Sequence, residues 1–101
     1  MSIDVLRSKI QKEEYELTLH ALKRRIERKI STEDIEHAIL NGEIIENYPN
    51  DEPFPSCLVA GLTKDNKPIH LVCAIAPVVK IITVYVPEED EWIEYKRRKR
   101  K

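Results

Sequence analysis

Residues 55–86, PSCLVAGLTKDNKPIHLVCAIAPVVKIITVYV, decide the fold class. Short runs rich in Val and Ile alternate here with Pro, Asn, Asp and Lys, a pattern typical of strands separated by turns. The segment KDNKP (64–68) is short enough to join antiparallel neighbours, and no helical pattern separates the later runs. EIIENY precedes this region and has the same character. The predicted strands are residues 43–48, 55–63, 68–76 and 79–86.

The chain before residue 43 has the periodicity of helices. Ser2, Thr18 and Ser31 are candidate N-caps, and Asp34 stands in the capping-box position after Ser31. Gly42 marks the end of the last helix. The predicted helices are residues 3–10, 19–29 and 32–41. We therefore predict an α+β fold in which N-terminal helices pack on one face of a four-stranded antiparallel sheet.

The length of 101 residues suits one domain with its own core, which we place at residues 1–95. Cys57 and Cys73 lie in apolar surroundings at a spacing that fits neither a zinc site nor a secreted disulfide scaffold, which favours a cytoplasmic location. The N-terminus is charged, and no apolar run approaches the roughly 18 residues of a membrane span. No membrane association is expected.

The charge is distributed unevenly along the chain. KRRKRK (96–101) holds six of the seventeen Lys and Arg residues, so in the rest of the chain eleven cations face eighteen acids, a net charge of −7. A terminal run of like charge repels itself, and we expect a disordered tail. It is either an RNA-binding element or a solubilising end. The candidate RNA-binding residues are Lys96, Arg97, Arg98, Lys99, Arg100 and Lys101.

His20, Arg24 and Arg28 recur every four residues and form one stripe on the second predicted helix. They are either a binding site for a phosphate or carboxylate, or a solvated helix face. The apolar residues of this helix define a side that we expect to be buried, opposite the stripe. These residues are Leu19, Leu22, Ile26 and Ile30.

Three strand residues are further candidates. His70 alternates with apolar neighbours and is either a satisfied core residue or the one titratable group of its face. Thr83 and Tyr85 share a face that differs from that of Ile82 and Val84, and their hydroxyls suit either a ligand surface or a half-exposed sheet.

Several chemistries have no support in the sequence. There is no glycine-rich phosphate loop, no His or Cys pair with metal-ligand spacing, and no nucleophile turn. We predict neither a cofactor nor a metal site.

The pattern TLHALKRRIERKISTEDIEHAILNGEIIENYP, with IHLVCAI and IITVYVP, resembles the family catalogued as domain of unknown function 4258 over about residues 15–92. That family is similar in predicted architecture to the superfamily of barnase, EndoU, colicin nucleases and RelE-type toxins, small domains that cleave RNA without a metal. The family motif carries over onto residues of the helices and of the strands. They are His20, Arg24, Arg28, Gly42, Tyr48, His70, Thr83 and Tyr85.

The resemblance implies a RelE-toxin-like fold and a metal-independent endoribonuclease of the toxin type, with an acidic antitoxin as its partner. In this reaction the ribose 2′-hydroxyl attacks the adjacent phosphorus, a histidine takes or gives a proton, and arginines stabilise the added charge. The expected catalytic residues are His20, Arg24, Arg28, His70, Thr83 and Tyr85. The alternative is a non-catalytic module that binds RNA or protein through the same fold and the basic tail.

Overall fold

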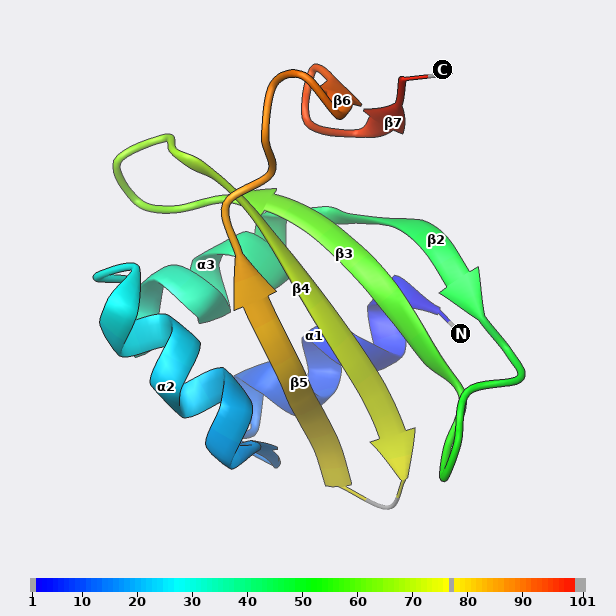
Figure 1. Cartoon of the computed structure of the whole chain (residues 1–101). Helices are drawn as coiled ribbons and strands as arrows, with labels where there is room; N and C mark the ends of the chain where they lie inside the picture. Colours follow the sequence, from blue (N-terminus) through cyan, green and yellow to red (C-terminus); the bar gives the residue numbers. More distant parts are fainter. Residues whose placement is uncertain (1, 77, 100–101) are drawn as a thin grey trace.

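The computed structural model describes residues 2–76 and 78–99 and is an α+β fold with helices against one face of a sheet (Figure 1). The helices are α1 (Ile3–Gln11), α2 (Leu19–Glu27) and α3 (Thr32–Asn41). The strands are β1 (Tyr15–Leu17), β2 (Glu43–Tyr48), β3 (Ser56–Leu62), β4 (Pro68–Ala76), β5 (Val78–Tyr85), β6 (Trp92–Ile93) and β7 (Arg97–Arg98).

The α+β class is confirmed, whereas the purely antiparallel four-stranded sheet is wrong. The main sheet has five strands in the order β1-β5-β4-β3-β2, and β1 runs parallel to β5. Strand β1 has only three residues and no apolar run of its own, so local sequence gives no signal for it. It exists because Tyr15–Leu17 pairs with a strand more than 60 residues away, and the Thr18 amide extends the pairing to the Ile81 carbonyl at 3.0 Å.

The predicted caps are present at all three helix starts. The side chains of Ser2, Thr18 and Ser31 accept hydrogen bonds from backbone amides in the first turn, and Ser31 with Asp34 forms the full capping box. Thr18 has a second role, because its hydroxyl donates to the Ile82 carbonyl of β5 at 2.8 Å. This bond fixes the start of α2 against the sheet.

The main core lies between the helices and the sheet. Helix α3 comes so close to β3 that a Cβ atom on Gly61 would overlap the backbone of Ala38. A Cβ atom on Gly42 would overlap the carbonyl oxygens of Ala38 and Ala60, so both positions require glycine for space. The buried core residues are Leu6, Ile10, Ala21, Ile30, Ile35, Ala38, Ile39, Cys57, Val59, Ile69, Leu71, Cys73, Val79, Ile81 and Val84.

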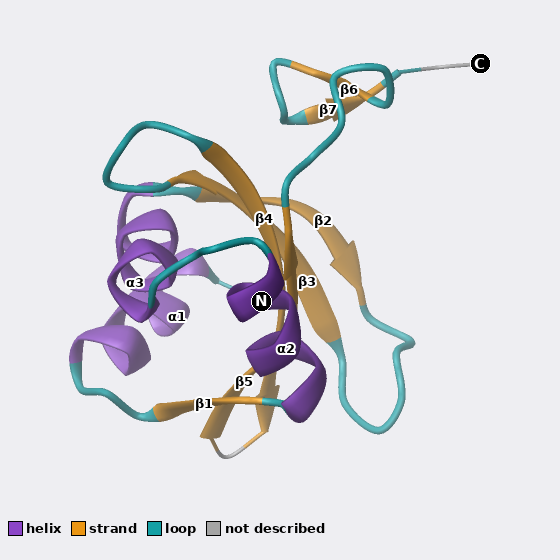
Figure 2. Ribbon diagram, turned by 60° about the vertical axis from the view of Figure 1, so that its left-hand side comes forward, coloured by secondary structure: helices purple, strands orange, loops and turns teal. Residues whose placement is uncertain are grey.

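The prediction of which side of α2 is buried is wrong. Ala21 is the residue of α2 that is fully buried, and Ile30 after the helix is also buried, but Leu19, Leu22 and Ile26 are 69%, 40% and 63% exposed. Small Ala21 lets the helix approach β5, and the Thr18 hydroxyl holds it in that rotation. The apolar stripe therefore faces solvent (Figure 2, where α2 is in front).

The alternation expected along β5 is also interrupted. A bulge lies between the pairs Val72–Thr83 and Cys73–Ile81, so Ile82 has no direct partner. Because of the extra residue, Ile81 and Val84 both point into the core, and Ile82 does not share a face with Val84. Thr83 and Tyr85 lie opposite Val72 and His70, on the face away from the core.

The C-terminal segment folds back over the end of the sheet. Strands β6 and β7 pair as Trp92–Arg98 and Ile93–Arg97 and form a small second sheet at the end of the molecule where β5 finishes (Figure 1). Residues 97 and 98, which the charge pattern places in a disordered tail, instead form β7. Arg100 and Lys101 lie outside the described residues. Within the described chain, no helix is long and apolar enough to cross a membrane.

Candidate functional site

His70 lies on the face of the sheet away from the helices, yet its side chain is fully buried. The C-terminal segment covers it: the Trp92 ring stands edge-on to the imidazole, with centroids 4.5 Å apart and planes at 88°. Tyr85, opposite His70 on β5, makes a second edge contact at 5.2 Å. The outer face of the sheet thus has a polar, enclosed centre at one end.

A hydrogen-bond chain passes through the imidazole. Nε2 of His70 lies 2.5 Å from the carbonyl oxygen of Tyr95, and Nδ1 lies 3.1 Å from the hydroxyl of Tyr85. A carbonyl only accepts, so Nε2 carries the proton and Nδ1 accepts from the Tyr85 hydroxyl. A base, oriented by a backbone carbonyl, therefore contacts the hydroxyl of Tyr85.

Burial sets the charge state of this pair. Removal from solvent lowers the pKa of His70 below its ordinary value, although the Tyr95 carbonyl and Glu46 act in the opposite direction. Burial likewise raises the pKa of the Tyr85 hydroxyl. At neutral pH the imidazole is uncharged and the phenol keeps its proton.

Arg98 of β7 is held against β2 beside this pair. Its Nε and one terminal nitrogen donate to the two carboxylate oxygens of Glu46 at 2.7 and 3.2 Å, and its guanidinium lies 4.6 Å from the Trp92 ring centroid. The Tyr48 hydroxyl donates to Glu46 at 2.6 Å. Hydrogen bonding from Arg98 holds the pKa of Glu46 below its usual value, and burial raises the pKa of Tyr48 to about 12.

A cleft of about 210 Å³ opens next to the buried pair. Arg28, at the C-terminal end of α2, and Tyr85 line it together, so residues 57 positions apart reach one site. The side chain of Arg28 makes no hydrogen bond or ion pair with any other described residue. The complete lining is Arg28, Tyr85, Val86, Glu88, Glu91, Trp92 and Arg98.

Four of the expected catalytic residues do not line this cleft, and one of them, His70, is fully buried and hydrogen-bonded to Tyr85. His20 is exposed in the first turn of α2, and Arg24, one turn before Arg28, pairs with Glu27 at 3.2 Å. Thr83 lies two residues before Tyr85 on the outer face, opposite Val72. The structure brings together Arg28, His70 and Tyr85.

Two of the four described residues of the basic tail form ion pairs within the chain. Lys96 pairs with Glu43 at 3.3 Å and Arg98 pairs with Glu46, so β7 and the residue before it are attached to acidic residues of β2. Arg97 and Lys99 are exposed, and no ion pair links them to other described residues.

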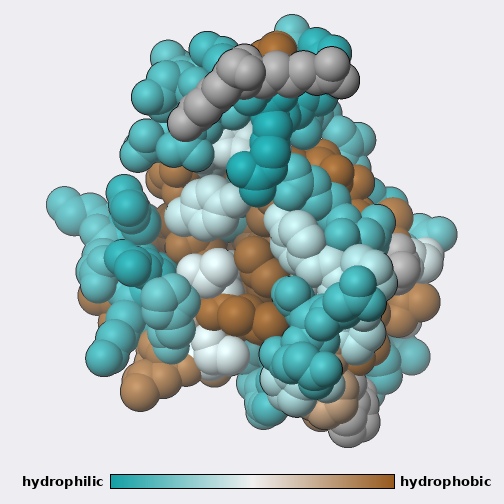
Figure 3. Space-filling model, turned by 45° about the vertical axis from the view of Figure 1, so that its right-hand side comes forward, coloured by the Kyte–Doolittle hydropathy of each residue, from teal (hydrophilic) through white to brown (hydrophobic). Residues whose placement is uncertain are grey.

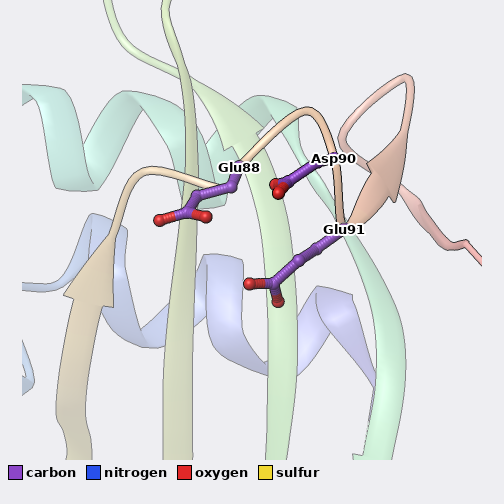
Figure 4. A group of neighbouring side chains, drawn as sticks. All are labelled: Glu88, Asp90 and Glu91. Carbon is purple, nitrogen blue, oxygen red and sulfur yellow. The ribbon is translucent and has the colours of Figure 1, made fainter.

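Three carboxylates gather on the loop between β5 and β6, where Figure 4 shows them converging. The ligand oxygens of Glu88, Asp90 and Glu91 lie within 4.8 Å of one another, and all three residues are exposed. Glu88 and Glu91 also line the cleft, so its charge is mixed: two guanidinium groups face two carboxylates.

A second, more apolar hollow of about 310 Å³ lies farther along the outer face, where β4 ends and β5 begins. Figure 3 shows hydrophobic side chains at the centre of this face between hydrophilic margins. Phe54, Ala74 and Ile82 provide apolar lining, Lys80, which pairs with Glu16 at 3.6 Å, provides a cation, and Asp51 and Glu52 provide carboxylates. The hollow therefore combines an aromatic ring and aliphatic side chains with charges of both signs.

Residues 17–86 match the family model described as domain of unknown function (DUF4258). The chain belongs to the DUF4258 family. No curated protein and no solved structure matches the chain. The DUF4258 match includes Arg28, His70 and Tyr85, but it ends before Trp92 and Arg98.

The sequence patterns of this DUF4258 protein do not identify the residues that close the site. They place Glu46 only in a strand, and the acidic run 88–91 only in a connection to the tail. One local signal for the closure is Trp92, a large aromatic between charged residues, which is buried against His70. Nothing local in the sequence indicates that Arg98 pairs with Glu46, because that contact joins residues 52 positions apart.

Proposed function

We propose that this protein is a metal-independent endoribonuclease whose reaction centre is the cleft between Arg28, Tyr85 and Arg98. The observation that carries the proposal is the hydrogen bond from the Tyr85 hydroxyl to Nδ1 of His70 at the wall of a cleft that holds two guanidinium groups. A hydroxyl hydrogen-bonded to an imidazole, next to guanidinium groups, can combine proton transfer with stabilisation of charge on a phosphoryl group.

Tyr85 and His70 would act together as the base. As the ribose 2′-oxygen forms its bond to phosphorus, its proton passes to the Tyr85 oxygen while the tyrosine proton passes to Nδ1 of His70. The Tyr95 carbonyl on Nε2 stabilises the resulting imidazolium. The bond from phosphorus to the 5′-oxygen breaks, that oxygen takes a proton from water, and His70 returns its proton to solvent. The products are a 2′,3′-cyclic phosphate and a 5′-hydroxyl.

Arg28 would stabilise the charge that develops on the phosphoryl oxygens. Its guanidinium is free of ion pairs within the described chain, whereas that of Arg98 is shared with Glu46. Guanidinium groups bind two phosphate oxygens at once. The apolar hollow beside Phe54 supports a single-stranded substrate, because an unstacked base can pack on an aromatic ring there.

The test is incubation of the purified protein with single-stranded RNA in the presence of a chelator. We expect cleavage that leaves 2′,3′-cyclic phosphate ends, and an Arg28→Ala variant that loses turnover by about 100-fold or more with a smaller change in RNA affinity. Arg24→Ala, on the same helix but outside the cleft, is the matched control. Activity abolished by the chelator, or products with 3′-hydroxyl ends, would exclude this mechanism. Either result would make Glu88, Asp90 and Glu91 the candidate ligands of a metal ion.

A second candidate function is RNA binding without cleavage. It is favoured by the exposed cations Arg97 and Lys99 on and beside β7. In that case the double variant Arg97→Ala, Lys99→Ala binds RNA more weakly and with a flatter salt dependence, by about 0.7 in log-log slope for each phosphate that it no longer contacts. In the enzyme, the same variant keeps its turnover at saturating RNA. An acidic antitoxin stays a prediction of the family resemblance.

A further inference from the structure

Helix α2 presents its apolar side to solvent. Leu19, Leu22 and Ile26 are 69%, 40% and 63% exposed, and their spacing of three and four residues places them within about 60° of one another on the helix. In Figure 2 no other element lies over the outer side of this helix. Large aliphatic side chains in one continuous stripe mark a contact surface, whereas scattered ones do not.

The spacing of the stripe matches a helix-to-helix seam. Leu19, Leu22 and Ile26 occupy the a, d and next a positions of a heptad, the positions that interlock with a partner helix. Lys23 and Arg25 then fall at the e and g positions on the two flanks. Arg25 donates to the Ile30 carbonyl, and neither cation pairs with a carboxylate of the described chain.

The flanking charges decide between occupants. In an antiparallel pair of two α2 helices, e faces e and g faces g, so Lys23 meets Lys23 and Arg25 meets Arg25. In a parallel pair Lys23 faces Arg25, which is again repulsive. A second copy of this chain is therefore disfavoured, and a partner with carboxylates at these flanks is favoured.

A membrane surface fits less well than a protein helix. The exposed stripe of this helix offers only three large apolar side chains, and the binding of a helix to a membrane surface scales with the apolar area that it buries.

We propose that Leu19, Leu22 and Ile26 form a docking surface for an amphipathic helix of another protein that has acidic residues on both sides of its apolar seam. This surface is separate from the cleft around Tyr85, and the proposal does not depend on ribonuclease activity.

The probe is a labelled three-heptad peptide with Leu at a and d and Glu at e and g, whose own charges oppose self-association. A matched peptide has Lys at e and g. We expect the acidic peptide to bind the full chain, as measured by fluorescence anisotropy, with a Kd at least about tenfold lower than that of the basic peptide. The double variant Leu19→Ser, Ile26→Ser should raise that Kd about tenfold or more, because it removes two apolar anchors.

Two controls make the result specific. Val5→Ser changes an exposed apolar residue of α1, which is 44% exposed, and should leave the Kd unchanged. Lys23→Glu should weaken binding of the acidic peptide and strengthen that of the basic one. Circular dichroism establishes that each variant is folded, as expected for exposed positions.

Several outcomes would overturn the proposal. Equal binding of both peptides, no binding below about 1 mM, or no effect of the double variant would exclude the acidic helix. A dimer in sedimentation that the double variant abolishes would identify a second copy as the occupant. Flotation with phosphatidylglycerol vesicles that the double variant abolishes would identify a membrane.

Discussion

The two faces of the sheet are built on different principles. The face toward the helices is apolar and closed, with a close approach of Ala38 to Gly61 that leaves no space for another atom. The outer face has two hydrogen-bonded pairs at one end, His70 with Tyr85 and Glu46 with Arg98, and a short C-terminal hairpin covers His70. One face holds the fold together, and the other holds hydrogen-bonded polar groups, of which His70 is fully buried and Arg98 is exposed. Burial of a polar group such as His70 opposes folding unless it is hydrogen-bonded.

Substitution of two neighbouring residues of β4, one on each face of the sheet, should show the largest difference in stability between the two faces. Leu71 is fully buried toward the helices, whereas Val72, next to it, is half-buried on the outer face. We expect Leu71→Ala to lower the free energy of unfolding by about 3 kcal/mol and Val72→Ala by about 1 kcal/mol, measured by urea denaturation. Equal decreases would mean that the outer face is as closely packed as the core.

A substitution in the hairpin over the outer face should lower the free energy of unfolding by less than Leu71→Ala does. Arg98→Ala removes two hydrogen bonds to Glu46 and the interaction with the Trp92 ring. Because the pair is partly exposed, we expect the free energy of unfolding to fall by about 1 kcal/mol, together with increased fluorescence quenching of Trp92. Arg97→Ala, the neighbouring exposed position of β7, is the matched control and should change neither quantity. Unchanged fluorescence quenching of Trp92 in the Arg98→Ala variant would show that other interactions hold the hairpin.

The fold class could be predicted from residues 43–86 because the turns and the β-branched runs are local signals. The rotation of α2 about its axis could not be predicted from the sequence. Its hydrophobic pattern favours burial of Leu19 and Ile26, whereas Ala21 is the residue that packs against the sheet. The Thr18 hydroxyl on β5, which fixes this rotation, is a long-range interaction.

The candidate site was predictable in part. Arg28, His70 and Tyr85 could be named, and they meet at one end of the outer face. His20 and Arg24 share the helical stripe but not the cleft, because only Arg28, which caps the end of α2, lies beside Tyr85. Trp92, Tyr95 and Arg98 cover the site only because the chain reverses direction after β5, and local sequence does not specify this reversal.

The smallest effect concerns pH. Burial lowers the pKa of His70 in the folded state, so below about pH 6.5 the unfolded chain binds a proton that the folded chain does not. Stability should therefore fall as the pH drops from about 7 to about 5, and Arg98 next to the imidazole adds to this while Glu46 opposes it. A His70→Gln variant should show a shallower dependence of its urea midpoint over this range. The same slope in both proteins would show that His70 is solvated.

The most direct test of the account is a comparison of two tyrosines of the outer face. Tyr85 and Tyr48 are both half-buried and both hydrogen-bonded, but only Tyr85 donates to His70 and lines the cleft. With a chelator present and single-stranded RNA at saturation, Tyr85→Phe should reduce the rate of formation of 2′,3′-cyclic phosphate ends by about 100-fold or more, and Tyr48→Phe by less than about threefold. A Tyr85→Phe protein that is folded and cleaves RNA at the rate of the wild type would contradict the assignment of the reaction to this face.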